Sequence, residues 1–411
     1  MIVEILNTGT ELLLGEVVNT HAAWFGKQLF PLGLRVSRQI TVPDGGAIGQ
    51  ALLETFGRAD IVLVTGGLGP TTDDITRESV AELLGLKLGM DSRIREKIEA
   101  MLAARGFALR ERMVSQCMVP ERATVLTNDH GTAPGLYIPP VAGSPHLFLF
   151  PGPPRELHPM FQASALPILR TICGGLPARE CRTYRIVGLG ESAVEEMVGL
   201  RLSNQPGLEI GYCARPNEVD LRVIGSREKL EEYEPGILMA VGDHLVSCNG
   251  EQLEEWVVGR LRSLGLTVST AESCTGGLLA NRLTNIPGAS GCFLRGYVTY
   301  ANEAKISDLG VPGELIRGHG AVSGEVAGAM AEGCLRKAGT DFALSLTGIA
   351  GPDGGTESKP VGTVFTALAR KGKATAISRS VFSRDRETFK QLATQSALDM
   401  LRREILRAGK S

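Results

Sequence analysis

Residues 266–283 read Leu-Thr-Val-Ser-Thr-Ala-Glu-Ser-Cys-Thr-Gly-Gly-Leu-Leu-Ala-Asn-Arg-Leu, and this stretch decides the local fold. Its β-branched first part predicts a strand, and its end predicts a helix. Ser273 would then lie in the turn between them, beside N–H groups that the helix leaves unbonded. Those groups and the helix dipole favour a phosphate or a developing oxyanion. The plainer interpretation is that Ser273 and Thr275 only cap the helix.

The composition excludes several classes of protein. With 411 residues the chain is too long for one core, and its 43% hydrophobic and 21% charged residues are typical of soluble globular domains. A net charge of -2 gives no electrostatic argument for nucleic acid. The eight cysteines form no C-x-x-C pair, which predicts free thiols and a cytoplasmic protein. We expect no signal peptide and no membrane span, because the chain opens on a strand pattern and no apolar run is long enough.

The order of apolar runs predicts an α/β protein with three domains. Residues 1–172 alternate strand and helix patterns, which predicts three layers with a parallel sheet between helices. The composition of 173–178 predicts a linker. Residues 178–247 predict a small α+β domain of β-α-β-β-α order, and 251–411 predict a mixed sheet flanked by helices.

Ser273 needs a base, because a serine hydroxyl is a poor nucleophile at neutral pH. One candidate is His319, on a predicted loop, and the other is Lys305, where residues 296–305 pass from a strand into a helix. A desolvated lysine can lose its proton and accept one from a serine. The plainer interpretations are a solvated lysine and, at the start of the last helix, a surface Arg386. An arginine opposes the dipole at that end, and an anionic ligand would remove the penalty.

Several motifs of the last domain resemble the CinA family of competence/damage-inducible proteins, whose C-terminal domain resembles nicotinamide-nucleotide amidohydrolases. In chain order they are AESCTGG at 271–277, YANEAK at 300–305, HGAVS at 319–323, TGIAGPDGG at 347–355, KPVGTV at 359–364 and SRDR at 383–386. The resemblance implies hydrolysis of the carboxamide of nicotinamide mononucleotide to nicotinic acid mononucleotide and ammonia. It implies no metal or cofactor for this reaction.

The same resemblance implies roles for single residues. Ser273 would be the nucleophile, Lys305 its base, and Tyr300 would assist Lys305 or position the amide. The predicted substrate-binding residues are Thr275, Gly276, Gly277, Thr347, Gly348 and Arg386. Which glycine loop meets the phosphate and which meets the oxyanion stays open.

Two glycine-containing loops follow predicted strands in the first domain, at 7–15 and 66–74. Glycines at strand ends let backbone N–H groups approach phosphates, and Asp73 and Asp74 could hold a hydrated divalent cation. The plainer interpretation is that these two aspartates cap the helix beginning at Thr76. The predicted nucleotide-binding residues are Thr10, Glu11, Gly66, Gly67, Gly69 and Asp73, with Asp73 and Asp74 as metal ligands.

These loops, with 131–135 and 151–154, resemble the molybdopterin-binding fold of the CinA N-terminal domain. The resemblance implies metal-dependent cleavage of ADP-ribose to AMP and ribose 5-phosphate. Two alternatives remain: a molybdopterin-binding first domain with only the amidase active, and an interaction protein in competence or DNA repair. We expect no nucleic-acid partner, because the middle domain lacks a G-x-x-G loop with basic neighbours. The middle domain and the helix predicted at 227–246 suggest a homodimer.

Overall fold

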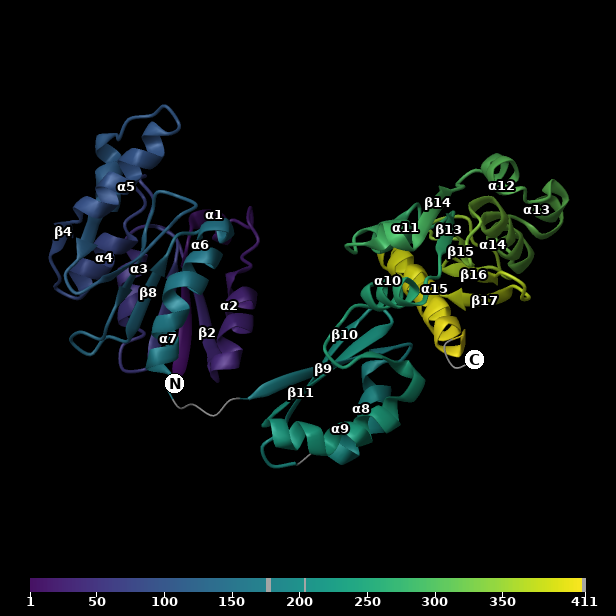
Figure 1. Ribbon diagram of the computed structural model, residues 1–411, viewed down its shortest axis with the longest axis horizontal. Coiled ribbons are helices and arrows are strands. Elements are labelled where there is room, and N and C mark those ends of the chain that lie inside the picture. Colours follow the sequence, from purple (N-terminus) through teal and green to yellow (C-terminus); the bar gives the residue numbers. More distant parts are fainter. Residues whose placement is uncertain (175–178, 203–204, 409–411) are drawn as a thin grey trace. The chain divides into compact units, whose positions relative to one another are not determined.

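The computed structural model describes residues 1–174, 179–202 and 205–408. It forms two compact units, Met1–Arg179 and Glu180–Ser411, which are described separately (Figure 1). Most of the linker predicted at 173–178 lies outside the described residues. No helix in the described ranges combines the length and apolarity needed to cross a membrane.

The first unit is built on a six-stranded sheet of order β2-β1-β3-β8-β7-β6. Its strands are β1 Ile2–Thr8, β2 Arg35–Val42, β3 Ile61–Thr65, β6 Thr124–Leu126, β7 Gly135–Ile138 and β8 His146–Phe150. The first three strands and β8 run parallel, whereas β7 and β6 are antiparallel to their neighbours. The prediction of an all-parallel sheet is therefore wrong at this edge. The connections 127–134 and 139–145 are too short for the crossover that parallel pairing requires.

Helices cover both faces of this sheet, so the predicted three layers are confirmed. One buried cluster joins α2, α6, η3 and α7 to one face, and a second joins α3 and α4 to the other. The bounds are α1 Thr10–Leu13, α2 His21–Leu29, η1 Phe30–Leu32, α3 Ala47–Leu53, α4 Thr76–Leu83, α6 Pro154–Met160, η3 Phe161–Ala165 and α7 Leu166–Ile172. Beside them lie β4 Leu88–Met90, α5 Ser92–Ala103, η2 Glu111–Cys117 and β5 Met118–Pro120. The π-helical turn η3 interrupts the helical segment from α6 to α7, which contains Pro159 and Pro167.

The loops after β1 and β3 meet at the carboxyl edge of this sheet. From β1 the chain goes to β2 on one side and later to β3 on the other, so the strand order reverses between β1 and β3. In open α/β sheets such a reversal opens the crevice in which ligands bind. The two loops predicted to bind a nucleotide therefore begin at the position that this topology favours.

The second unit begins with a four-stranded antiparallel sheet of order β10-β11-β9-β12. The elements are β9 Glu180–Val187, α8 Glu191–Leu202, β10 Glu209–Arg215, β11 Glu218–Gly225, α9 Arg227–Val241, η4 Gly242–His244 and β12 Leu245–Ser247. Apolar side chains of α8 and α9 form one buried cluster with this sheet. The predicted β-α-β-β-α order is present, with the short strand β12 added.

The rest of the unit is a five-stranded mixed sheet of order β14-β13-β15-β16-β17, in which β14, β13 and β15 are parallel. The strands are β13 Val268–Glu272, β14 Phe293–Val298, β15 Phe342–Gly348, β16 Thr363–Arg370 and β17 Ala376–Val381. The helices are α10 Leu253–Leu264, α11 Leu278–Thr284, η5 Ala289–Gly291, α12 Asn302–Leu309, α13 Gly313–His319, α14 Gly324–Ala338 and α15 Arg386–Ala408. The mixed sheet is as predicted. Helix α13 was expected to be a loop, since its two glycines lower its helix propensity.

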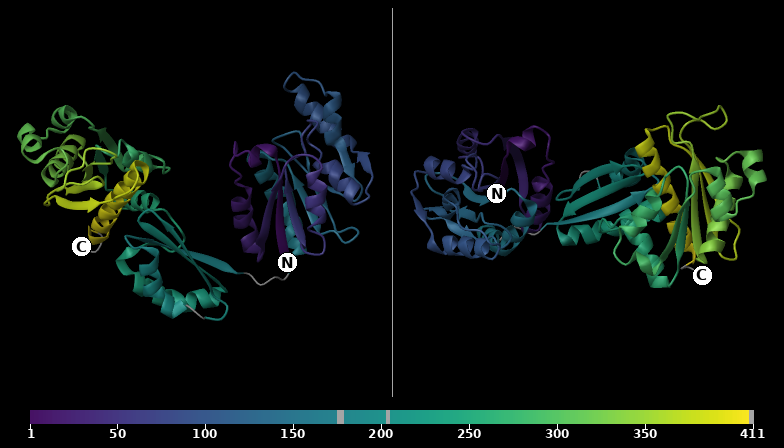
Figure 2. Two further views of the ribbon diagram at one scale, coloured as in Figure 1. Left: turned by 180° about the vertical axis from the view of Figure 1, so that it is seen from behind. Right: turned by 90° about the horizontal axis from the view of Figure 1, so that it is seen from above.

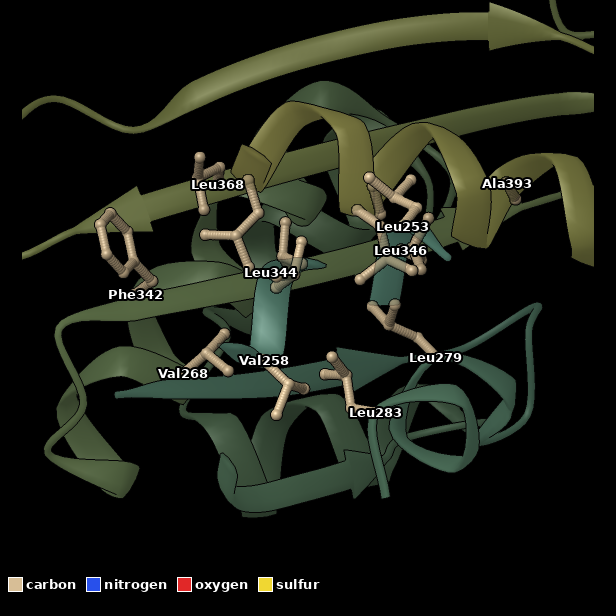
Figure 3. Packing of buried hydrophobic residues seen from close by; sticks show 14 of the residues in the cluster. Leu253, Val258, Val268, Leu279, Leu283, Phe342, Leu344, Leu346, Leu368 and Ala393 are labelled. Carbon is tan, nitrogen blue, oxygen red and sulfur yellow. The ribbon is translucent and has the colours of Figure 1, made fainter. Parts of the chain in front are cut away.

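Two layers of helices enclose this sheet (Figures 1 and 2). Helices α10, α11 and α15 pack on one face, where Leu253, Leu279 and Leu346 meet in a buried cluster (Figure 3). Helix α14 covers the other face with small and apolar side chains. Because both faces are buried, the strand ends and their turns are the places left for chemistry.

Helix α15 also joins the two sheets of the second unit. The Gln395 amide donates to the Glu218 carboxylate on β11 over 2.9 Å. Arg402 is buried and donates to the carbonyls of Leu245 and Asp243. The helix that covers the five-stranded sheet is therefore bonded to the four-stranded one.

Candidate active site

Ser273 lies just past the carboxyl end of β13, the strand between β14 and β15. Its N–H donates to the Leu346 carbonyl at 2.9 Å, which continues the pairing of β13 with β15 by one residue. The side chain is nearly buried. A serine held this way has a defined backbone position at the sheet edge, as the sequence predicts.

Lys305 from α12 reaches this serine. Its side chain is only 1% exposed, and Nζ lies 3.1 Å from Ser273 Oγ. Nζ also lies 2.9 Å from the Thr299 carbonyl and 3.2 Å from the Tyr300 carbonyl. Burial lowers the pKa of Lys305, and the negative charge of Glu303 opposes that shift only in part. The solvated-lysine interpretation is therefore wrong.

These three contacts leave a neutral amine able to act as the base. An uncharged Nζ has two N–H groups and one lone pair, and backbone carbonyls can only accept. An ammonium would donate to all three oxygens, whereas a neutral amine that donates to the carbonyls of Thr299 and Tyr300 keeps its lone pair for the Ser273 hydroxyl. His319, the alternative base, ends α13, where Nδ1 lies 3.4 Å from Glu325 Oε1. Lys305 is thus the basic side chain bonded to Ser273.

Glu272, which the sequence analysis did not single out, organises the turn. It is fully buried, and its carboxylate accepts from four donors. They are the Thr275 hydroxyl at 2.7 Å and the N–H groups of Gly277, Leu279 and Ala280 at 3.2, 3.0 and 2.8 Å. The carboxylate thereby binds the amino-terminal N–H groups of α11. An acidic residue just before a glycine turn into a helix was the signal available in the sequence.

The prediction that the N–H groups opening α11 form an oxyanion site is therefore wrong for most of them. The Leu278 and Gly276 N–H groups are also used, by the Thr275 and Ser273 carbonyls. Within the described ranges, the N–H groups of Cys274 and Thr275 have no hydrogen-bond acceptor in another residue, and that of Cys274 bonds only to its own thiol. These two groups directly follow Ser273.

The predicted capping role for the turn hydroxyls is also wrong. The N-cap residue of α11 is Gly277, and the Thr275 hydroxyl bonds to Glu272 instead. Gly276 and Gly277 have φ values of 61° and 94°, a region in which most side chains are strained. Both glycines thus serve the tight turn. Burial raises the pKa of the adjacent Cys274 thiol to about 12, so this thiol is a poor nucleophile.

Tyr300 and Arg386 meet at the exposed side of the turn. Arg386 Nη2 donates to the Tyr300 hydroxyl and Nη1 to the Gly351 carbonyl, both at 2.9 Å. The Tyr300 ring is 63% exposed, and only its backbone carbonyl contacts Lys305. Arg386 therefore bonds to two segments around the site, 347–355 and 300–305.

Thr347 and Gly348 lie at the end of β15, but they shape the loop rather than present side chains. The Thr347 hydroxyl is buried and donates to the Ala321 carbonyl at 2.8 Å. A Cβ at Gly348 would lie 2.7 Å from the Thr363 carbonyl, so only glycine fits there. Their contribution to substrate binding stays a prediction.

Lys390 is a second residue that the sequence analysis missed. It lies one turn after Arg386 on α15, and a Cβ at Gly276 would lie 3.8 Å from its Nζ. The signal was the spacing of four between two basic residues, which places them on the same side of a helix.

The glycines of the loop after β3 leave room for this chain's own side chains. A Cβ at Gly66 would lie 2.5 Å from the Thr8 carbonyl, and one at Gly67 would lie 2.0 Å from Thr76 Oγ1. At Gly69 the same atom would lie 2.4 Å from the Asp74 carboxylate. These glycines are explained by close packing, whether or not a phosphate binds.

Asp73 and Asp74 do not cap the following helix. The N-cap residue of α4 is Ile75, with no side-chain bond. The Asp74 carboxylate instead accepts from the N–H and hydroxyl of Thr71, and Asp73 is exposed. The capping interpretation is therefore wrong for both.

The other two residues predicted for this site lie in the loop after β1. The N–H and hydroxyl of Thr10 donate to the Asp44 carboxylate at 3.0 and 3.2 Å. The Glu11 carboxylate lies against Gly9, whose Cβ would be 2.6 Å from Oε1. Among the residues described, no three potential ligands group as a metal site. Mg²⁺ is often held by one or two carboxylates and completed by substrate phosphates, and two aspartates in an open loop fit that type.

Comparisons with known proteins cover nearly the whole chain. Three family models match: the CinA C-terminal domain at 250–405, a probable molybdopterin binding domain at 4–171, and the damage-inducible protein CinA KH domain at 181–238. A CinA-like protein of Akkermansia muciniphila is 46% identical over 96% of this chain and 95% of its own. One of Dictyoglomus thermophilum is 41% identical over 98% and 99%. A crystal structure of competence/damage inducible protein CihA from Agrobacterium tumefaciens, 40% identical, covers 37% of this chain and 96% of that one, with a TM-score of 0.36.

Proposed function

The chain belongs to the CinA family, and from this premise we propose that residues 250–405 hydrolyse the carboxamide of nicotinamide mononucleotide. The products are nicotinic acid mononucleotide and ammonia. One observation supports this most directly: the buried Lys305 Nζ lies 3.1 Å from Ser273 Oγ. A protein that only docks partners has no need of a buried lysine held against a serine hydroxyl.

The reaction begins when Ser273 Oγ attacks the carboxamide carbon and Lys305 Nζ takes the hydroxyl proton. The carbonyl oxygen becomes an oxyanion, which the free N–H groups of Cys274 and Thr275 stabilise. The carbon–nitrogen bond then breaks, and the Lys305 ammonium returns the proton to the departing ammonia. An ester on Ser273 remains.

Water completes the reaction by attacking this ester. Lys305 accepts a proton from the water, the carbon–oxygen bond to Ser273 breaks, and the proton returns to Ser273 Oγ. The carboxylate product leaves. Because two carbonyls and the serine surround Nζ, the amine stays aimed at Oγ in both halves of the cycle.

The test is ammonia release by Ser273→Ala and Lys305→Met variants of the full chain. We expect each variant to lose on the order of a thousand-fold in kcat, because the nucleophile and its base act as a unit. The matched control is Lys371→Met, in an exposed turn of the same domain. Near-normal ammonia release by either site variant would refute the Ser-Lys mechanism.

For the first unit we propose cleavage of ADP-ribose to AMP and ribose 5-phosphate. Support comes from the loops after β1 and β3, which meet where the strand order reverses. Asp73 and Asp74 would hold a divalent cation, which supplies charge neutralisation and an activated water when bound. Backbone N–H groups of the loop from Gly66 to Gly69 would bind the pyrophosphate.

This second proposal has its own test. The full chain should release AMP from ADP-ribose only with added Mg²⁺, and Asp73→Asn together with Asp74→Asn should abolish the release. Cleavage that continues after thorough chelation would contradict the site. Molybdopterin binding without any AMP release would favour the alternative, a first domain that binds molybdopterin.

We also propose that the protein is cytoplasmic, in keeping with its eight free thiols. A homodimer is a further expectation. We do not propose a nucleic-acid function for the middle domain. The family model there is named for a KH domain, yet residues 180–247 contain no G-x-x-G sequence to clamp a nucleic-acid backbone.

A further inference from the structure

Two cations on α15, Arg386 and Lys390, lie beside the Ser273 turn and form no ion pair in the part of the chain that the structure describes. Arg386 donates hydrogen bonds to the Gly351 carbonyl and the Tyr300 hydroxyl. Lys390 is half-buried and forms no ion pair within the described ranges. By contrast, Arg402 and Arg403 on the same helix both pair with Asp399. The start of α15 therefore presents two cations without an ion pair in the described ranges, although Asp385 and Glu387 are adjacent to Arg386 in the chain.

Geometry directs both cations toward the turn. Residues four apart lie on one side of a helix, so Arg386 and Lys390 are neighbours. A Cβ at Gly276 would lie 3.8 Å from Lys390 Nζ and close to no other atom, so the ammonium borders open space at this glycine. Arg386 bonds to the Tyr300 hydroxyl, and the Tyr300 carbonyl in turn contacts the Lys305 amine. Lys390 thus borders the turn at Gly276, and Arg386 borders the segment that supplies Lys305.

This arrangement is unfavourable without an anion. Like charges four residues apart on a helix repel each other, and a cation in the first turn of α15 opposes the helix dipole. A phosphate monoester between the two side chains would remove both penalties. Arginine and lysine are also the side chains that proteins use to bind phosphate.

We propose that Lys390, with Arg386, binds the phosphate of the substrate and makes the site select phosphorylated over unphosphorylated nicotinamide ribosides. This inference rests on the proposed amidase and names a specificity-determining residue of the same site. Lys390 takes no part in bond breaking. Its removal should therefore change substrate binding and leave the chemical step alone.

The first experiment compares nicotinamide mononucleotide with nicotinamide riboside as substrates for the wild-type chain, Lys390→Met, Lys390→Arg and the control Lys371→Met. For Lys390→Met we expect KM for the mononucleotide to rise on the order of ten-fold to a hundred-fold, as for a lost charged hydrogen bond, with kcat nearly unchanged. Activity on the riboside should not change, and Lys390→Arg should restore most of the preference. An unaltered preference in Lys390→Met would overturn the inference.

A second readout separates this inference from the amidase proposal. Inorganic phosphate is titrated by calorimetry into the wild-type chain, Lys390→Met and Lys371→Met. Weaker phosphate binding by Lys390→Met alone supports the site, and equal binding by all three overturns it. If the wild-type chain releases ammonia from neither amide, the proposed reaction fails and the phosphate titration still decides the role of Lys390.

Discussion

The turn after β13 and the loop after β3 have the same local pattern and different environments. Both follow a buried parallel strand, and both are rich in glycine. In the first, the buried Lys305 bonds to Ser273, and the buried Glu272 carboxylate accepts from Thr275 in the same turn. In the second, Asp73 is exposed and the space beside the glycines is filled by Thr8, Thr76 and Asp74. A glycine-rich strand end alone thus indicates a tight turn, and buried charge with defined partners indicates chemistry.

The largest expected effect comes from replacing Glu272, the buried carboxylate that distinguishes the turn after β13 from the loop after β3. Glu272→Gln keeps the shape but turns an NH2 group toward N–H donors. Removing one partner from such a buried network should reduce stability by about 3 kcal/mol. We also expect ammonia release to fall on the order of a hundred-fold, because the Ser273 turn loses its support.

The measurements for Glu272→Gln are ammonia release and amide hydrogen exchange at α11. The control is Glu314→Gln, an exposed carboxylate of the same domain. If Glu272→Gln keeps both normal activity and normal protection of α11, the carboxylate does not organise this turn.

The pH dependence tests the buried lysine directly. In the proposed mechanism the base is the neutral amine, so ammonia release should rise about ten-fold per pH unit below the lowered pKa of Lys305 and level off above it. The midpoint of this limb should lie below the pKa of an ordinary lysine. A pH–rate profile between pH 5 and about 10 checks this. A limb centred at the pKa of a solvated lysine would contradict the role of burial.

Stability should respond to the same group. Because the folded pKa lies below the unfolded one, the unfolded chain binds more protons between the two values. The free energy of unfolding therefore rises with pH in that window, and the penalty is fully present below the folded pKa. Lys305→Met should remove this dependence, which thermal melting against pH would detect.

The last prediction concerns stability alone and compares the two glycine turns. Gly67→Ala places a methyl group 2.0 Å from Thr76 Oγ1 at a φ of 66°, and should destabilise the first unit by about 3 kcal/mol. Gly276→Ala has a similar φ, 61°, but meets only Lys390 Nζ at 3.8 Å, and should lose about 1 kcal/mol. Amide hydrogen exchange measures the two losses separately, at α4 for Gly67→Ala and at α11 for Gly276→Ala. Equal losses at both sites would mean that packing does not distinguish them.

Much of this organisation was readable from residue patterns. Periodicity predicted most strands and helices, including β13 and α15, because local apolar spacing reflects burial on one or two faces. It failed for β6 and β7, which are short, and for α13, which contains two glycines. The family motifs also pointed to Ser273, Lys305 and Arg386. Residue patterns did not identify Glu272 or Lys390. Glu272 lies inside the motif that contains Ser273, and Lys390 lies outside the family motifs, one turn after Arg386.

The amino-acid sequence by itself determined the α/β class, the family, and the pairing of a serine with a lysine as chemical partners. Only the tertiary structure decided which N–H groups remain free and which cations remain without an acid, because both depend on neighbours distant in the chain. Lys305 shows the difference most clearly. Its identity is written at one position, but its lowered pKa follows from the burial that the fold creates around its amine.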